Sequence, residues 1–212
     1  MINIFDIDHT VYRGSTFQDF LLRGLLERRL PASLFLSLPI VTLSFIINGG
    51  SVREGRGNSF LKGISREGMV SLASDIFEDK IKARLNPEIL KIIRSLQNRN
   101  EKVMLATSSF RVIIEPLAHF LNIDKIIATE FEYKNGFTTG KLDGKPAFGQ
   151  GKKEKMEIFF KNEKIDPANC SFYTDSYRDL PLMEIVGLPV AVNPDRKLMK
   201  TALERKWKII RS

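Results

Sequence analysis

The sequence predicts an α/β fold, a doubly wound parallel sheet with an inserted helical cap. After residue 86, short apolar runs such as 103–106 and 189–192 alternate with segments of helical periodicity. Continuous apolar strands between helices are typical of a parallel sheet that is covered on both faces. Between about 15 and 85, helical patterns follow one another without strands. We therefore expect residues 1–14 and 86–212 to form the α/β core, and residues 15–85 to form the cap.

Individual elements follow from local signals. A first strand is expected over 1–7, where side-chain alternation would turn Asp6, Asp8 and Thr10 to one side. Ser15, with Gln18 three residues later, has the pattern of a capping box that opens a helix. Further strands are expected at 103–106, 125–129, 171–174, 189–192 and 207–210. Helices are expected at 65–84, at 111–121 (capped by 107–109), at 150–162 and at 182–186, with one more that begins at 86 and another that ends near 205. A tight hairpin is expected at 135–136.

Composition limits the classes of partner. The 212 residues are 43% hydrophobic and 27% charged, as in an ordinary globular protein, and the net charge is +8. This excess favours anionic partners, namely phosphorylated metabolites, nucleic acid or an acidic membrane surface. No run of Lys and Arg is longer than two residues, so the charge is scattered and we expect no nucleic-acid binding.

The single cysteine, Cys170, excludes an internal disulfide and a cysteine-based zinc site, and we expect it to be a small buried strand residue. The first residues lack a basic region followed by an apolar one, so no secretory signal is expected and a cytoplasmic location is the prediction.

Residues 30–47 carry no charge. Pro31 and Pro39, together with four hydroxyl residues, argue against a clean membrane-spanning helix. A buried helix pair within the cap is the favoured interpretation. A membrane-spanning helix, and a surface that contacts acidic membrane lipid, remain as alternatives, so membrane association stays open.

Polar side chains gather where strands of the predicted sheet end, and ligands of open α/β sheets bind at that edge. The three groups are Asp6, Asp8 and Thr10, then Thr107 and Ser108, then Asp175 and Asp179, with Lys152 at a glycine-flanked helix start. Several carboxylates without a His or Cys cluster favour a hard cation, Mg²⁺, and a lysine and hydroxyls opposite it suit a phosphoryl group. One carboxylate can then attack phosphorus, while a second protonates the leaving oxygen and later activates water.

These residues resemble the four motifs of the haloacid dehalogenase superfamily in their usual order, over essentially the whole chain. The motifs are Asp6-Ile7-Asp8-His9-Thr10-Val11, the apolar strand ending in Thr107, Lys152 in Gly-Gln-Gly-Lys, and 175–182. The inserted region with 60–64 and the tail 190–195 resemble the phosphoserine phosphatase-like subfamily (IB), which has a helical cap of the C1 type.

The resemblance implies a magnesium-dependent phosphatase with Asp6 as nucleophile and Asp8 as general acid and base. Thr107 and Lys152 would bind phosphate, with a helix cap as the alternative role of Thr107. Ser108 is a further phosphate-binding candidate, for which a helix cap is the favoured role. The implied metal ligands are Asp6, the backbone carbonyl of Asp8 and Asp175, with Asp179 orienting a metal-bound water or Lys152; Lys153 competes with Lys152. Alternation would send His9 away from Asp6 and Asp8, so a structural role is expected for it and for His119.

The substrate is expected to be a small phosphorylated metabolite. Phosphoserine phosphatases carry a glutamate that reads the substrate's amino group, and the corresponding position here is Ser15; Arg56 is the cap candidate for a substrate carboxylate. The apolar segment 34–47 instead resembles caps of relatives that act on lipid phosphates such as phosphatidylglycerophosphate. A phosphate-sensing module without turnover, and a lipid-surface protein, are alternatives from other classes. The oligomeric state is not predicted.

Overall fold

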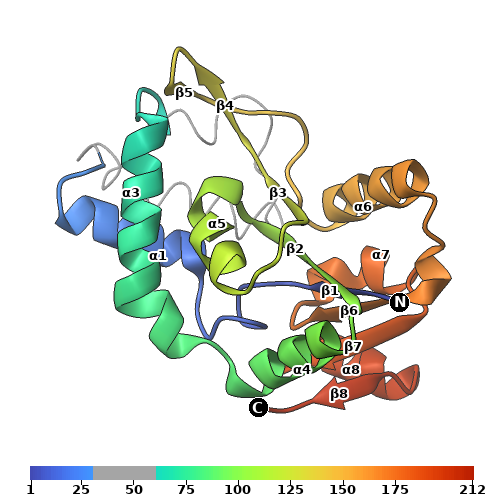
Figure 1. The fold of residues 1–212 in the computed structure, drawn as a ribbon. Helices are drawn as coiled ribbons and strands as arrows, with labels where there is room; N and C mark the ends of the chain where they lie inside the picture. Colours follow the sequence, from blue (N-terminus) through green and yellow to red (C-terminus); the bar gives the residue numbers. More distant parts are fainter. Residues whose placement is uncertain (31–60) are drawn as a thin grey trace.

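A six-stranded parallel sheet with helices on both faces forms the body of the molecule (Figure 1). The structure, a computed structural model, describes residues 1–30 and 61–212. The strands of the sheet are β1 (Ile2–Phe5), β2 (Lys102–Phe110), β3 (Ile126–Thr129), β6 (Cys170–Thr174), β7 (Leu188–Val192) and β8 (Lys208–Ile210). Their spatial order is β3-β2-β1-β6-β7-β8, so the first strand of the chain lies in the middle.

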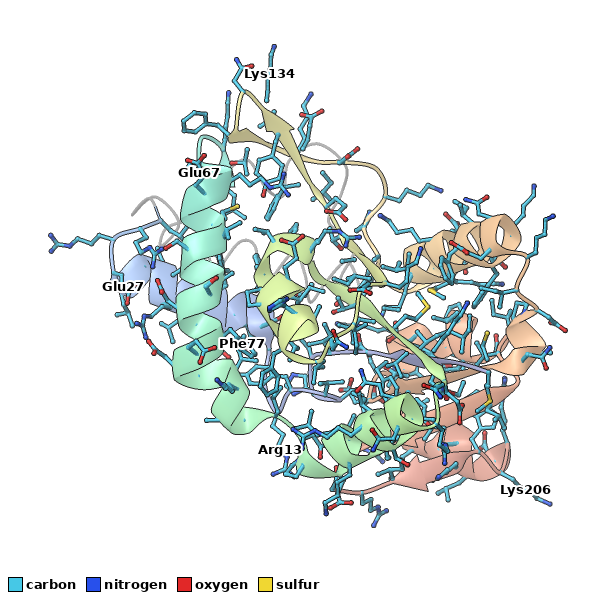
Figure 2. All side chains as sticks on the ribbon, viewed as in Figure 1. Arg13, Glu27, Glu67, Phe77, Lys134 and Lys206 are labelled. Carbon is cyan, nitrogen blue, oxygen red and sulfur yellow. The ribbon has the colours of Figure 1, made fainter. Side chains whose placement is uncertain are left out.

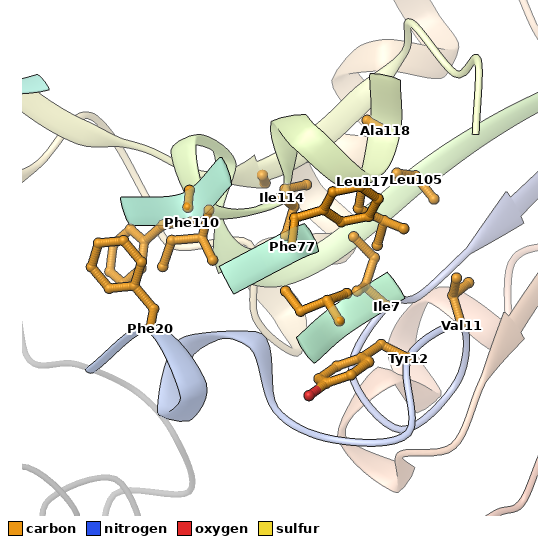
Figure 3. Close-up of a cluster of buried hydrophobic side chains, with 14 of the residues drawn as sticks. Ile7, Val11, Tyr12, Phe20, Phe77, Leu105, Phe110, Ile114, Leu117 and Ala118 are labelled. Atoms are coloured by element: carbon orange, nitrogen blue, oxygen red, sulfur yellow. The ribbon is translucent and has the colours of Figure 1, made fainter. Parts of the chain in front are cut away.

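Alternating side chains of the strands divide the interior into two apolar layers. Phe5 and its neighbour Tyr173 face one layer, whereas Ile4 and Phe172 face the other. The helices are α1 (Thr16–Leu26), α3 (Arg66–Ile76), α4 (Pro87–Asn98), α5 (Arg111–Phe120), α6 (Gln150–Glu163), α7 (Leu180–Met183) and α8 (Arg196–Glu204). The first four supply the first layer, part of which Figure 3 shows, and the last three supply the second.

From the start of α3 to Arg84 the chain is continuously helical. After α3 come a π-helical turn (Phe77–Ile81) and a 3₁₀ turn (Lys82–Arg84). The predicted start of α4 is found, because the Asn86 side chain accepts a hydrogen bond from the backbone N–H of Glu88 at 3.2 Å and Pro87 is the first helical residue. Two more 3₁₀ turns, Pro167–Asn169 and Tyr177–Asp179, flank β6.

The expected hairpin is present as β4 (Phe131–Lys134) and β5 (Phe137–Leu142), with Lys134 at its tip (Figure 2). Asn135 and Gly136 between them have φ of 52° and 82°, the left-handed values that a tight hairpin turn requires. The residues before α3 join this hairpin, because Gly63 N–H donates to the Thr138 carbonyl and Arg66 N–H to the Gly136 carbonyl, both at 2.8 Å. The hairpin therefore links the core to the segment that leads into α3.

The fold-class prediction is confirmed, but three local predictions are wrong. β1 ends at Phe5, and Ile7 to Tyr12 form a tight loop in which His9 is left-handed (φ 58°), so strand alternation does not govern Asp8 or His9. β2 continues through 107–109 to Phe110, so these hydroxyl residues do not cap α5. Ser15 is the N-cap residue of α1 without a side-chain bond to the helix.

The division into a core of 1–14 and 86–212 and a cap of 15–85 stays a prediction. Within the described ranges 1–30 and 61–212, no helix is long and apolar enough to cross a membrane. Arg56 and nearly all of the apolar stretch 30–47 lie outside the described residues.

Candidate active site

The register of the sheet brings the polar motifs to one edge. Phe5 pairs with Leu105 of β2 and with Tyr173 of β6, and all three strands run in the same direction. Asp6 therefore leaves β1 level with Thr174, and Thr107 lies two residues beyond the Leu105 pair. The carboxyl ends of these strands form the edge at which α/β proteins bind ligands.

Asp6 lies in a buried ion cluster with Lys152. The Lys152 ammonium is 3.1 Å from Asp6 Oδ1 and 2.7 Å from Asp179 Oδ2, and it is only 1% exposed. Thr174 Oγ1 donates a further hydrogen bond to Asp179 Oδ2 at 2.8 Å. Lys152 comes from the first turn of α6, whereas its neighbour Lys153 turns away to pair with Glu157 at 3.6 Å. One cation thus holds carboxylates from two separate motifs together.

Asp8 has a different environment, built from neutral donors at the start of α1. Its Oδ1 accepts from the backbone N–H of Thr16 at 2.9 Å and from the Thr16 hydroxyl at 2.8 Å. Its Oδ2 accepts from the Ser15 hydroxyl at 3.2 Å. Ser109 of β2 contacts the Thr16 hydroxyl at 2.7 Å. Ser15, expected to open the helix or to contact substrate, thus directs its hydroxyl to Asp8.

Asp175, the first residue after β6, lies near Thr10, whose hydroxyl is 3.5 Å from Asp175 Oδ1. Burial raises the pKa of Asp175 to about 6, although the charge of His9 acts in the opposite direction. The pKa of Asp6 is also raised, mainly by burial. The charge of Lys152 lowers this pKa, whereas the negative charges of Asp179, Asp175 and Asp8 raise it further. The ionised carboxylates are therefore costly in this space without additional positive charge.

The pKa of Asp8 is raised as well. Burial is the largest cause, and the hydrogen bonds from Thr16, the charge of His9 and the Ser15 hydroxyl only partly offset it. A carboxyl group with a raised pKa holds a proton at higher pH, which suits a group that must donate one. His9 is exposed, and its charge lowers the pKa of Asp8 and of Asp175. The structural role expected for His9 stays a prediction.

The hydroxyl residues that end β2 have separate contacts. Thr107 is 1% exposed, and its Oγ1 accepts from the backbone N–H of Ser109 at 3.1 Å. The backbone carbonyl of Ser108 accepts from the Thr129 hydroxyl at 2.8 Å. The register places Thr107 at the same sheet edge as Asp6.

The donor set fits a hard divalent cation held by few ligands. Among the described residues, no three His, Cys, Asp or Glu side chains are arranged to bind a metal together. Mg²⁺ does not need such a cage, since it commonly takes one or two carboxylates and keeps several waters. Buried Asp6 and half-buried Asp175 provide two carboxylates of raised pKa. Asp179 is already bonded to Lys152 and Thr174, and the Asp8 side chain to the start of α1.

Sequence reasoning missed three polar residues, namely Thr16, Ser109 and Thr174. Thr174 directly precedes Asp175 at the end of an apolar strand, a position that could have indicated it. The contact between Thr16 and Ser109 joins residues 93 positions apart, and no local pattern indicates such a pair.

A family model described as haloacid dehalogenase-like hydrolase matches residues 4–184, a range that contains every carboxylate described above. The chain belongs to this family. Within it, phosphoserine phosphatase SerB1 of Mycobacterium tuberculosis is 28% identical over 212 residues, which cover 97% of this chain and 68% of that protein. Histidinol-phosphatase of Neisseria meningitidis is 30% identical over 150 residues, covering 69% of this chain and 68% of that protein.

A solved structure of a protein with unknown function from Bordetella pertussis has the same fold, with a TM-score of 0.84 at 24% identity over 99% of this chain and 97% of that chain. The predicted membership of the haloacid dehalogenase superfamily, with phosphoserine phosphatase-like relatives, is confirmed. The chain is a hydrolase of phosphoric monoesters, that is, a phosphatase of this family.

Proposed function

We propose that the chain is a magnesium-dependent phosphatase that hydrolyses a small phosphorylated metabolite through an aspartyl-phosphate intermediate. The observation that carries this proposal is the buried contact between Lys152 and Asp6, 3.1 Å apart, at the edge where three motifs meet. A carboxylate beside a fixed cation suits attack on a phosphoryl group, because the cation offsets the negative charge on both partners.

In this proposal Asp6 is the nucleophile. One of its oxygens attacks phosphorus, and the bond from phosphorus to the leaving oxygen breaks as the new bond forms. Lys152 and Thr107, with Ser108 beside them, bind the oxygens of the transferring phosphoryl group. Asp179 accepts from Lys152 at 2.7 Å and so holds the ammonium in place.

Asp8 is proposed as the general acid and base. It gives its proton to the leaving oxygen in the first step and takes a proton from the attacking water in the second. The second step releases phosphate and returns Asp6 to its free carboxylate. The raised pKa of Asp8, caused mainly by burial, supports the acid role.

Asp6 and Asp175, with the backbone carbonyl of Asp8, are the proposed ligands of Mg²⁺. When bound, the cation supplies positive charge that neutralises the phosphoryl oxygens and the two carboxylates. The raised pKa values of Asp6 and Asp175 support this assignment, since their burial leaves the ionised forms without enough counter-charge.

The names of the two relatives given above indicate phosphoserine and histidinol phosphate as their substrates, which supports a small substrate here. Ser15 carries no charge to pair with an ammonium group, and its hydroxyl is bonded to Asp8, so phosphoserine itself is not the favoured substrate. A lipid phosphate is kept as an alternative because of the apolar stretch 30–47. The proposed location is the cytoplasm, with membrane contact only if a lipid phosphate is the substrate.

A screen of phosphorylated metabolites and lipid phosphates with Mg²⁺ tests the proposal. We expect phosphate release from at least one small metabolite, and a loss of at least about a thousandfold in kcat for Asp6→Asn. Asp124→Asn, at an exposed position in the loop before β3, is the matched control and should keep full activity. Full activity of Asp6→Asn would contradict the proposal, and stable labelling of Asp6 without phosphate release would favour a sensing module.

A further inference from the structure

Two buried hydroxyl groups, of Thr16 and Ser109, stand behind Asp8. Thr16 is the first residue of α1 and is 0% exposed, and Ser109 lies near the end of β2 and is 4% exposed. Their oxygens are 2.7 Å apart, so the start of α1 and the end of β2 are joined through these side chains.

The donors of this chain can be assigned by counting hydrogens. An ionised carboxylate only accepts, so the Thr16 hydroxyl must donate its single hydrogen to Asp8 Oδ1, from which it lies 2.8 Å away. Ser109 must then be the donor in its contact with Thr16. The hydrogen bonds run in one direction, from Ser109 to Thr16 to Asp8.

The two oxygens of Asp8 are consequently unequal. Oδ1 accepts two hydrogen bonds from Thr16, one from its backbone N–H at 2.9 Å and one from its hydroxyl. Across the described part of the chain, Oδ2 has a single hydrogen bond, from the half-buried Ser15 hydroxyl at the longer distance of 3.2 Å. A hydroxyl can donate or accept, so Ser15 is compatible with Oδ2 in either protonation state.

We propose that Thr16, supported by Ser109, is a positioning residue that fixes Oδ1 of Asp8 against α1 and thereby presents Oδ2 as the oxygen that transfers the proton. This inference rests on the proposed function of Asp8. In the first step the proton leaves Oδ2 for the leaving oxygen while the phosphorus–oxygen bond breaks and Asp6 bonds to phosphorus. In the second step a proton of the attacking water returns to Oδ2.

Ser109 also connects this arrangement to the phosphate side of the site. Its backbone N–H donates to Thr107 Oγ1 at 3.1 Å, while its own hydroxyl contacts Thr16. The same residue thus sets the position of the proposed phosphate-binding hydroxyl and supports the proposed acid. A shift of α1 relative to β2 would disturb Asp8 through this contact.

Leaving-group dependence tests the proposal, because only a poor leaving group needs the proton. The measurement is kcat/KM, which covers the steps up to transfer of the phosphoryl group, for glycerol 2-phosphate and for p-nitrophenyl phosphate. We expect Thr16→Val to lose about 10- to 100-fold on glycerol 2-phosphate, part of the contribution of general acid catalysis, and less than about threefold on p-nitrophenyl phosphate. Ser109→Ala should show the same selectivity with a loss of about three- to tenfold.

Two further variants separate positioning from folding. Thr16→Ser retains the hydroxyl and should restore both substrates to near the wild-type values. Thr138→Val removes another buried hydroxyl, on β5, which donates to the Leu61 carbonyl and not to Asp8, and it should leave the ratio of the two kcat/KM values unchanged. Thermal unfolding of each variant shows that the compared proteins are folded.

Equal losses of Thr16→Val on both substrates, or no loss on either, would overturn the positioning role while leaving the proposed phosphatase in place. Failure of the proposed function has a different signature. In that case the wild-type protein releases no phosphate from any compound of the metabolite and lipid-phosphate screen, or Asp6→Asn is as active as the wild type.

Discussion

Asp6 and Asp8 are separated by one residue, yet the molecule supports them in opposite ways. Asp6 faces a buried cation, Lys152, which also binds Asp179 from another motif. Asp8 faces neutral donors of Ser15 and Thr16. The loop that follows β1 turns the two carboxylates toward different neighbours.

The difference shows how two carboxylates in one short motif can favour different protonation states. Burial raises the pKa of both groups. At Asp6 a full positive charge opposes that effect and favours the ionised form that a nucleophile needs. At Asp8 only hydrogen bonds and the charge of His9 oppose it, and hydrogen bonds are directional, so they orient the group as well. Substitution of the residues that contact Asp6 should therefore reduce stability and activity together. Substitution of the residues that contact Asp8 should mainly change the orientation of its carboxyl group.

The largest effect is expected for Lys152→Met. Removing one partner of a buried ion cluster leaves carboxylates without their counter-charge, and we expect the free energy of unfolding to fall by about 3–5 kcal/mol at pH 8. Phosphatase activity should be lost as well. Chemical denaturation and phosphate release measure the two effects, and Lys152→Met/Asp179→Asn should be less destabilised than the single variant.

Lys153→Met is the matched control, since its ion pair with Glu157 lies at the surface at 3.6 Å. Its cost should be at most about 1 kcal/mol. Equal destabilisation by Lys152→Met and Lys153→Met would show that the buried ion pair of Lys152 with Asp6 contributes no more stability than the surface ion pair of Lys153.

A smaller effect is expected for Mg²⁺ binding as a function of pH. The pKa of Asp175 is raised to about 6 from an ordinary value near 4, so ionisation of this group destabilises the metal-free fold as pH rises from about 4 to about 6. Bound Mg²⁺ needs the ionised form, and protons compete with it below about pH 6. Saturating Mg²⁺ should raise Tm more at pH 7.5 than at pH 5.

Asp175→Asn should abolish most of the Mg²⁺-dependent increase in Tm at both pH values. An equal increase for the wild type at pH 5 and pH 7.5 would argue that Asp175 is not a ligand.

The smallest effect is expected for Ser15→Ala. The bond to Asp8 is 3.2 Å long and half-buried, so water can replace it, and its loss should cost about 0.5–1.5 kcal/mol of stability. We expect kcat/KM to change by less than about threefold on glycerol 2-phosphate and on p-nitrophenyl phosphate. A loss as large as that of Thr16→Val would mean that Oδ2, rather than Oδ1, is the oxygen that must be held.

Local chemistry made most of the fold predictable. Short apolar runs such as 103–106, between helical segments, indicate buried strands, and the Asn86-Pro87 and Asn135-Gly136 pairs have backbone preferences that favour a helix start and a turn. Because parallel strands end at one edge, the meeting of Asp6, Lys152 and Asp179 could also be anticipated.

Predictions failed where a side-chain contact or the end of a strand, and not the local pattern, decides the outcome. Ser15 has the sequence of a helix cap, but its hydroxyl is bonded to Asp8. Side-chain alternation gives the directions of Asp8 and His9 only if the strand continues through them, but β1 ends at Phe5. The Thr16–Ser109 pair depends on packing of α1 against β2, which no local pattern specifies.

The central position of β1 has a consequence for biosynthesis. Ile2 pairs with Lys102 on one side and with Cys170 on the other, so the strand made first must wait for both partners. Pairings between such distant segments form late, because a long loop must close before they stabilise anything. During translation the apolar residues of β1 therefore lack their second neighbouring strand until β6 has emerged from the ribosome. Premature release of the growing chain before that point would leave this strand exposed to aggregation.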